Sequence, residues 1–397
     1  MGFFEVGIQA YFYMLVGTIS LWLGFISYKI KKREKYVDTR ILEMSSDRIL
    51  SGWLFLFFIL GFCCFCLPFV PKAILIAQAQ GAAEMDNKDE IIFGGGSLVT
   101  ITYNIGMAIA SKLAVAALGL AIVTKKIKKY FFVAIVCVVL QVFYVILSGA
   151  RGGVMAVIYN LLFVYLCVHA NEKKLNVKPK QVILFTTLFI GVFYLMTLVS
   201  NFRMHGRVEM DKSEQTETNK YMAQKFLDYS LAPINLFDIS LKENYFDKLD
   251  GYRFGKATFA GVDFFINSVA KRVGVDYETD LYIVDYLQEH RKRCSKDHDY
   301  NYVYSMFFFN YMDFGFLGIL VLPFIFGLTF RYVIGWYYRF TNFPRLLMVV
   351  LFFGFMISSH MTSPFIRPWD MLYLAIIIMW DKLDRVFNVK SYKRCLV

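Results

Sequence analysis

The chain has 397 residues, of which 57% are hydrophobic and 18% aromatic, and its formal net charge is +12. A soluble globular domain is typically about 45–50% apolar, and here the excess is gathered in blocks that reach the length of a membrane-spanning helix. The positive charge does not indicate nucleic-acid binding, because no basic stripe with interleaved aromatic residues lies on a soluble stretch. The sequence therefore predicts an all-α polytopic membrane protein.

Long apolar runs predict the membrane-spanning helices. We expect nine spans, at 8–30, 49–70, 97–123, 131–149, 153–170, 181–200, 316–338, 346–362 and 371–383. The N-terminal run lacks the positive n-region of a signal peptide, so we expect it to be retained as the first span. One further apolar run, 303–314, is short for a span, and we expect it to be re-entrant or to lie in the interface.

The distribution of lysine and arginine predicts the orientation, because short cytoplasmic loops of membrane proteins are rich in both. The basic segments are 29–48, 124–130, 171–181, 338–346 and 382–397. Placing them in the cytoplasm puts the N-terminus outside and the C-terminus inside. The hydrophilic segment 201–302 is too long for this rule, and the alternation of spans places it outside.

The chain is accordingly expected to have three parts. Residues 1–200 form an N-terminal bundle of six spans, residues 201–302 an extracytoplasmic loop, and residues 303–397 a C-terminal bundle with a cytoplasmic tail. Within the loop, apolar residues of the segment GYRFGKATFAGVDFFINSVAKRVG recur at helical spacing, namely Phe259, Val262, Phe265, Ile266 and Val269. This amphipathic helix is either the core of a small outer domain or lies on the bilayer surface, and we favour the surface.

An arginine stands between small residues in the hairpin SGARGG, where two apolar runs meet with no room for a loop. The glycines on either side of Arg151 allow close approach of the backbone. Arg151 either snorkels to lipid headgroups or directs its guanidinium at a phosphate in a crowded pocket. We favour the phosphate, because a lipid anchor needs no small neighbours, whereas close approach of a substrate does.

Other cations are expected at the same outer depth. Arg203 and Arg207 lie in SNFRMHGR, where a span emerges, and Arg367 lies between prolines in the last outer hairpin. Together they predict a shared anionic site, since a planar guanidinium binds phosphate oxygens in two-point fashion. Lys112 lies within the span 97–123 and either contacts a diphosphate or pairs with a buried carboxylate.

The candidate acid–base residues are Asp313 in NYMDFGFLG, His298 in SKDHDYNYVY and His205 in SNFRMHGR. One histidine beside carboxylates lacks the spacing of metal ligands, so no metal is expected. No GxGxxG, P-loop or HExxH motif occurs, so no cofactor is expected either. If the protein is an enzyme, its substrate must carry its own activation.

Four segments together resemble one known family: SGARGG, SNFRMHGR, the amphipathic segment 251–274, and NYVYSMFFFNYMDFGFLGILVLPFIFG. The pattern resembles oligosaccharide repeat-unit polymerases, the Wzy-type O-antigen or capsule polymerases of bacteria. The resemblance implies a GT-C-like transmembrane bundle of about nine to eleven spans in the cytoplasmic membrane. It also implies a glycosyltransferase that joins undecaprenyl-diphosphate-linked units on the outer side, with a chain-length regulator as a possible partner protein and no nucleic acid.

The resemblance assigns roles to the candidate residues. The diphosphate would be held by Arg151, Arg203 and Arg207, with further contacts from Lys112, Arg253 and Arg367. The general base would be Asp313, His298 or His205.

Two other functions remain open. An O-antigen ligase would share the hairpin arginines and the large outer loop, although the absence of histidine from 251–274 favours the polymerase. A flippase for the same lipid-linked substrate is the transporter alternative. The chain shows no internal repeat of the kind common in transporters, and its loop of about a hundred residues is unlike that of a compact transporter.

Overall fold

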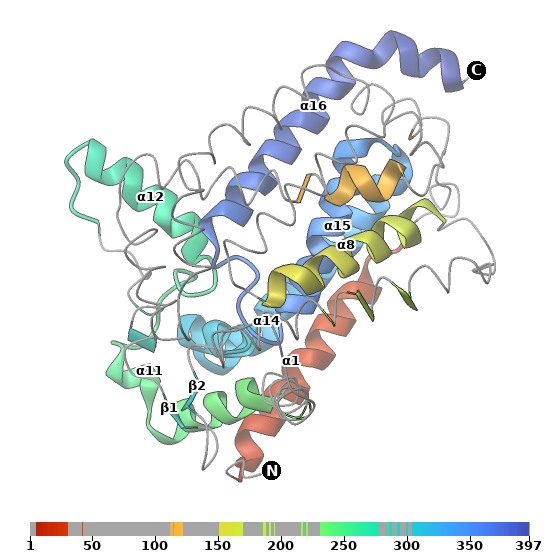
Figure 1. Ribbon diagram of the computed structural model, residues 1–397. Helices are drawn as coiled ribbons and strands as arrows, with labels where there is room; N and C mark the ends of the chain where they lie inside the picture. Colours follow the sequence, from red (N-terminus) through yellow and green to blue (C-terminus); the bar gives the residue numbers. More distant parts are fainter. Residues whose placement is uncertain are drawn as a thin grey trace, which may run out of the picture. The chain divides into compact units, whose positions relative to one another are not determined.

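The computed structural model describes part of the chain (Figure 1). The described residues are 5–30, 42, 112–113, 115–121, 151–169, 186–187, 190–191, 194, 216, 220, 231–277, 283, 286–287, 292–293, 299–300 and 304–396, with side chains left out at 151–158, 293, 299–300 and 387–396. The predicted spans 49–70 and 131–149 lie outside these residues, as do most of 97–123 and 181–200.

The described residues are almost entirely helical, which confirms the all-α fold class. The helices are α1 (Ile8–Ser27), α8 (Arg151–Val168), α11 (Tyr245–Lys248), α12 (Ala260–Arg272), α14 (Met306–Arg339), α15 (Phe343–Ser358) and α16 (Pro368–Leu396), with a further helical stretch at 231–242. Two short strands, β1 (Lys292–Arg293) and β2 (Asp299–Tyr300), pair antiparallel, with Lys292 opposite Tyr300.

The chain packs as two compact units. The first unit comprises Met1–Lys35, Lys225–Arg339 and Leu351–Met379, and the second comprises Tyr36–Gln224, Phe340–Val350 and Trp380–Val397. These units follow packing, whereas the predicted division into 1–200, 201–302 and 303–397 follows the sides of a membrane. That division stays a prediction.

Helices α1 and α14 lie side by side in the first unit and run in the same direction (Figure 1). Small residues make the contact possible. A Cβ added to Gly24 would lie 2.0 Å from the carbonyl oxygen of Phe324, and one added to Gly327 would lie 2.1 Å from that of Leu21. Ser20 donates a hydrogen bond across the same interface to a carbonyl of α14. Close packing through small residues is typical of helices that associate in a membrane.

The outward faces of the same two helices carry large apolar side chains. On α1 the exposed residues are Ile8, Tyr11, Phe12, Leu15, Ile19, Trp22, Leu23 and Ile26, and on α14 they are Phe316, Leu317, Leu320, Val321, Ile325 and Tyr332. The buried residues of α1 are the small ones, Ala10, Gly17, Ser20 and Gly24. Large residues outside and small residues inside are the reverse of the pattern in a soluble helix.

Two described helices, α1 with 20 residues and α14 with 34, are long and apolar enough to cross a membrane. Twenty helical residues span about 30 Å, the thickness of the hydrocarbon core. The predicted spans 153–170, 346–362 and 371–383 overlap α8, α15 and α16. Helix α16 continues to Leu396, well beyond the end of its predicted span, so the predicted cytoplasmic tail is helical. The count of nine to eleven spans stays a prediction.

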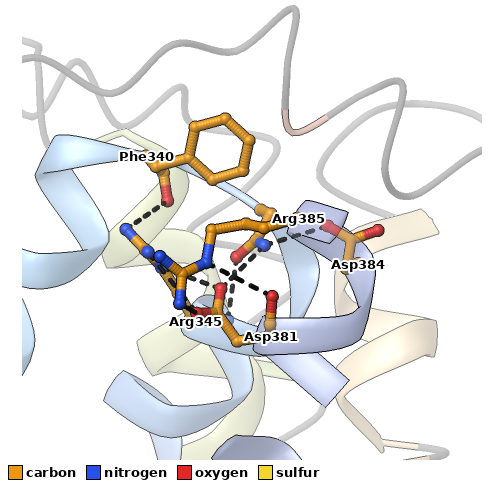
Figure 2. A network of polar contacts seen from close by, with 6 residues as sticks. Phe340, Arg345, Asp381, Asp384 and Arg385 are labelled. Carbon is orange, nitrogen blue, oxygen red and sulfur yellow. Dashed lines mark hydrogen bonds and ion pairs between the residues drawn. The ribbon is translucent and has the colours of Figure 1, made fainter. Parts of the chain in front are cut away.

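The second unit contains a buried ion-pair network that joins the start of α15 to α16 (Figure 2). Arg345 Nε donates to Asp381 Oδ1 at 2.8 Å, and an Nη of Arg385 lies 3.0 Å from Asp381 Oδ2. The Asn342 amide donates to both Asp381 and Asp384, each at 3.0 Å. Since Asp381 is fully buried, its charge depends on these partners.

Candidate functional site

Helix α14 breaks immediately after Asp313. Phe314 and Gly315 leave the helical region, and Gly315 has φ +58° and ψ −142°, a conformation that only glycine adopts readily. A Cβ on Gly318 would lie 1.9 Å from the carbonyl oxygen of Asn310, although these residues would be about 12 Å apart in an unbroken helix. The break therefore turns the first two turns of α14 away from the rest of the helix (Figure 1).

The segment before the break corresponds to the apolar run 303–314, which was expected to be re-entrant or interfacial. It is a short helical segment continuous with α14, and its residues from Met306 to Phe309 are all buried. Apolar residues surrounded by protein on every side explain why this run has the composition of a span without the length of one.

The break frees backbone carbonyls that the segment 253–258 then uses. The Arg253 N–H donates to the Met312 carbonyl at 3.2 Å, and the Phe254 N–H donates to the Asp313 carbonyl at 3.3 Å. In an unbroken helix both oxygens would accept from residues one turn further along. The segment 253–258 is thus joined to α14 by main-chain hydrogen bonds.

The carboxylate of Asp313 binds the same segment through two further hydrogen bonds. Its Oδ1 accepts the Ala257 N–H at 2.9 Å, and its Oδ2 accepts the Thr258 N–H at 2.8 Å. The Thr258 hydroxyl donates to Asn310 Oδ1 at 3.0 Å, and its carbonyl accepts from the Ser363 hydroxyl at 2.7 Å. Asp313 is fully buried, and both of its oxygens are engaged. This geometry favours a positioning role, while the general-base assignment stays a prediction.

The turn that leads into this segment is strained. Asp250, Gly251, Phe254 and Gly255 all have positive φ. A bulky aromatic residue in this conformation costs about 1–3 kcal/mol, so the surrounding hydrogen bonds must hold Phe254 in place. The strained turn presents two exposed rings, those of Tyr252 and Phe254, with centroids 6.2 Å apart.

Two of the predicted diphosphate-binding arginines adjoin this segment. Arg253 stands between Tyr252 and Phe254 in the sequence, but its side chain is only 14% exposed; its guanidinium donates to the Leu249 carbonyl and lies 3.9 Å from the Asp250 carboxylate. Arg367 is exposed and directly precedes α16, where its carbonyl accepts the Asp370 N–H at 3.2 Å. The backbone of Arg367 packs so closely against Gly261 that a Cβ there would lie 2.8 Å from the Arg367 carbonyl carbon.

The remaining predicted site residues lie in the second unit or outside the described residues. Lys112 is half-buried in a helical fragment of the second unit. Arg151 is the first residue of α8, so Gly152 and Gly153 are helical rather than part of a loop. The side chain of Arg151 is among those left out, and Arg203, Arg207, His205 and His298 lie outside the described residues. Their roles stay predictions.

Sequence reasoning missed the partners of Asp313. The carboxylate accepts the backbone N–H groups of Ala257 and Thr258, and the buried side chains of Asn310 and Ser363 hydrogen-bond to Thr258 in turn; nothing in the spacing of these residues marked them. The sequence does single out Asp313 itself, because it lies just before a predicted span and glycines follow it. In the residues that the structure describes, no group of three or more histidine, cysteine or acidic side chains could hold a metal.

A second polar cluster lies between the helical stretch 231–242, α11 and β1. Lys292 Nζ donates to both oxygens of Glu243, at 2.8 and 2.7 Å, and lies near the ring of Tyr245. The hydrogen bond from Lys292 lowers the pKa of the Glu243 carboxyl, and the bond to Glu243 raises the pKa of the Lys292 ammonium. Burial raises the pKa of the Tyr245 hydroxyl. This cluster ties the strand pair to the helices before it.

The fold and the site define a mainly helical protein with two helices that are able to cross a membrane and a strained, arginine-bearing turn held at the break in one of them. No family model, curated protein or solved structure matches the chain.

Proposed function

We propose that the protein is a membrane glycosyltransferase that polymerises undecaprenyl-diphosphate-linked oligosaccharide units on the outer side of the bacterial cytoplasmic membrane. The growing chain leaves one lipid carrier and is transferred to the non-reducing end of a new lipid-linked unit. The observation that carries the proposal is the turn at the α14 break, where Arg253 and Arg367 adjoin one short segment fixed by Asp313. The resemblance of the sequence to Wzy-type polymerases supplies the reaction class.

The parallel course of α1 and α14 supports a polytopic arrangement. Two helices that cross a bilayer in the same direction must be separated in the chain by an odd number of crossings, and the sequence predicts five between them. The ends of both helices meet at one side, where Arg339 donates to the Tyr28 hydroxyl at 2.9 Å. The basic segment 29–48 follows directly, which agrees with a cytoplasmic location of that side.

The chemistry requires little beyond charge placement. A diphosphate is a good leaving group, so the donor needs no nucleotide, and guanidinium groups stabilise the charge that develops on it. Tyr252 and Phe254 present apolar ring faces beside Arg253, and such faces are suited to stacking on sugars. The acceptor hydroxyl requires a base within hydrogen-bond reach. Because both oxygens of Asp313 already accept backbone N–H groups, the histidines His298 and His205 are the better candidates for that base.

The proposal is tested by the surface glycans of cells that carry variants of the gene. Replacing Arg151 by alanine should leave single repeat units and abolish long chains, and replacing it by lysine should do the same, because a point charge cannot reproduce the planar fork. Arg253→Ala should shorten the chains, whereas the control Lys382→Ala, which removes an exposed cation of α16, should leave their length unchanged.

The alternatives give different glycan profiles. Loss of all repeat units from the outer face on deletion of the gene would identify a flippase, and lipid-linked polymer that never reaches its final acceptor would identify a ligase. Long chains of normal length in the Arg151→Ala variant would remove Arg151 from the site.

A further inference from the structure

Helix α12 turns its apolar residues outward and its small and polar residues toward the protein. Its buried residues are small or polar, namely Ala260, Gly261, Asp263 and Asn267. Its apolar residues form the outward face, where Phe259 is 38% exposed, Val262 40%, Ile266 49% and Val269 62%, and the stripe continues to Val273 at 70%. These positions recur every three or four residues and therefore lie on one side of the helix. The described residues leave this face uncovered.

Specific contacts fix α12 in this rotation. The Gly261 N–H donates to the Phe365 carbonyl at 2.9 Å, and the Tyr277 hydroxyl donates to the Asp263 carboxylate. Phe264 packs edge-on against Trp369, with ring centroids 5.9 Å apart. Any side chain at Gly261 would collide with the backbone that precedes α16. The polar side of α12 is therefore held against the protein, and its apolar side cannot turn inward.

The position of α12 indicates what covers its apolar face. The chain that leads into α12 is bound to the α14 break, and Tyr252 lies against Gly315, directly before the exposed apolar residues Phe316 and Leu317 begin. The helix therefore starts at the level where the lipid-facing surface of α14 would begin. In Figure 1 α12 runs across the direction of α14 rather than along it.

The basic residues at the end of α12 also agree with a membrane surface. The last turn of α12 carries Lys271 and Arg272, both exposed; Lys271 lies opposite the apolar stripe, and Arg272 lies at its edge, three residues after Val269. Helices that lie in a membrane interface combine one apolar face with basic residues on the other, and they bury the apolar face about 5–10 Å into the boundary between headgroups and acyl chains. Basic side chains at that depth reach the lipid phosphates.

We propose that α12 lies in the outer leaflet of the membrane, with Phe259, Val262, Ile266 and Val269 among the acyl chains and Lys271 and Arg272 at anionic headgroups. The strained turn with Arg253 would then stand at the headgroup level, where the diphosphate of a lipid-linked substrate is found. The inference rests on the membrane insertion of the first unit that the proposed function assumes, and not on glycosyl transfer itself.

Photo-crosslinking of the full-length protein tests this placement. Benzoylphenylalanine is introduced in place of Val262, Ile266 or Lys271, and each variant is reconstituted in vesicles of phosphatidylethanolamine and phosphatidylglycerol. Leu317 of α14 and Ile19 of α1, both exposed, serve as reference positions for direct contact with lipid. Adducts are identified by mass spectrometry of the irradiated protein.

We expect strong lipid labelling at positions 262 and 266 and at both reference positions, and clearly weaker labelling at 271, whose side chain reaches only the headgroups. A covalent dimer, or no lipid adduct at 262 and 266 while 317 and 19 react, would overturn the placement of α12 and leave the membrane insertion of the first unit intact. Equal lipid labelling at 266 and 271 would also overturn it, because one face would not be selected. No lipid adduct at any position would overturn both this inference and the proposed function.

Discussion

Replacing Asp313 by alanine should release the segment that carries Arg253. The variant leaves the N–H groups of Ala257 and Thr258 buried without their acceptor. An unsatisfied buried donor costs about 1–3 kcal/mol, so the pair should cost about 2–6 kcal/mol, toward the lower end if water enters the vacated space. Asp313→Asn retains one acceptor oxygen and should lose about half as much.

Limited proteolysis with trypsin reports this release directly, because Arg253 and Lys256 are themselves cleavage sites. When the segment opens and closes quickly, the rate of cleavage follows the population of the open form. A loss of about 2 kcal/mol corresponds to cleavage about 30-fold faster at these two sites. The matched control is Asp250→Asn, which alters an exposed carboxylate in the same turn and keeps a residue type that tolerates positive φ.

The reasoning fails if Asp313→Ala is cleaved after Arg253 and Lys256 no faster than Asp250→Asn. The variants Asp313→Ala and Asp313→Asn separate positioning from catalysis. If Asp313 is a positioning residue, activity should fall in step with the increase in cleavage, so Asp313→Asn should be less impaired than Asp313→Ala. If Asp313 is a general base, both variants should be equally inactive.

Three further predictions concern stability. Asp381→Asn should lower the free energy of unfolding by about 3–5 kcal/mol, because it leaves the guanidinium of Arg345 buried without its carboxylate. Arg345→Met should lower it less, because Arg385 and Asn342 still bind Asp381. Thermal unfolding in detergent measures both effects, with the exposed Lys382→Met as the control. Gly24→Leu should force α1 and α14 apart at a cost of about 3 kcal/mol or more, while exposed Leu23→Ala should leave the melting temperature nearly unchanged. The ion pair between Glu243 and Lys292 should weaken as pH falls through the lowered pKa of Glu243, and also as pH rises through the raised pKa of Lys292. Amide hydrogen exchange at α11 and β1 should therefore become faster at both pH extremes. Glu243→Gln should remove the acceleration at low pH.

The spans that could be predicted are those whose composition alone decides their environment. The runs 8–30 and 316–338 coincide with α1 and the long second part of α14, because about twenty consecutive apolar residues are favoured as one helix in an apolar environment. The break at Gly315 could not be predicted in the same way. It depends on the donors of Arg253 and Phe254, which lie some sixty residues earlier in the chain.

For α12, the amphipathic pattern predicted the helix but not the surroundings of its apolar face. The spacing of Phe259, Val262, Ile266 and Val269 predicted a helix with one apolar face, but the pattern cannot say whether that face meets protein or lipid. The tertiary contacts of Gly261 and Asp263 decide it, and they turn the apolar face outward. Phe265, which the pattern had included in the stripe, is half-buried and packs near Trp369 instead.

Charged residues were the least predictable part of the sequence. Arg345 was counted among the cytoplasmic cations of 338–346, yet its guanidinium is buried and paired with Asp381, which lies within the predicted span 371–383. Counting charges by segment is blind to such pairing, because the two partners are far apart in the chain. The place of Asp313 just before a predicted span marks it as a candidate, but its partners are backbone N–H groups, which no sequence pattern displays.

The central claim, that arginines on the outer side of the membrane hold a lipid-borne diphosphate during chain growth, is tested most directly with purified protein in vesicles supplied with polyprenyl-diphosphate-linked repeat units. Gel profiles of the glycan should show a ladder of products for the wild-type chain and single units for both Arg151→Ala and Arg151→Lys. A ladder of normal length from the lysine variant, or no chain growth by the wild-type protein on this substrate, would contradict the account.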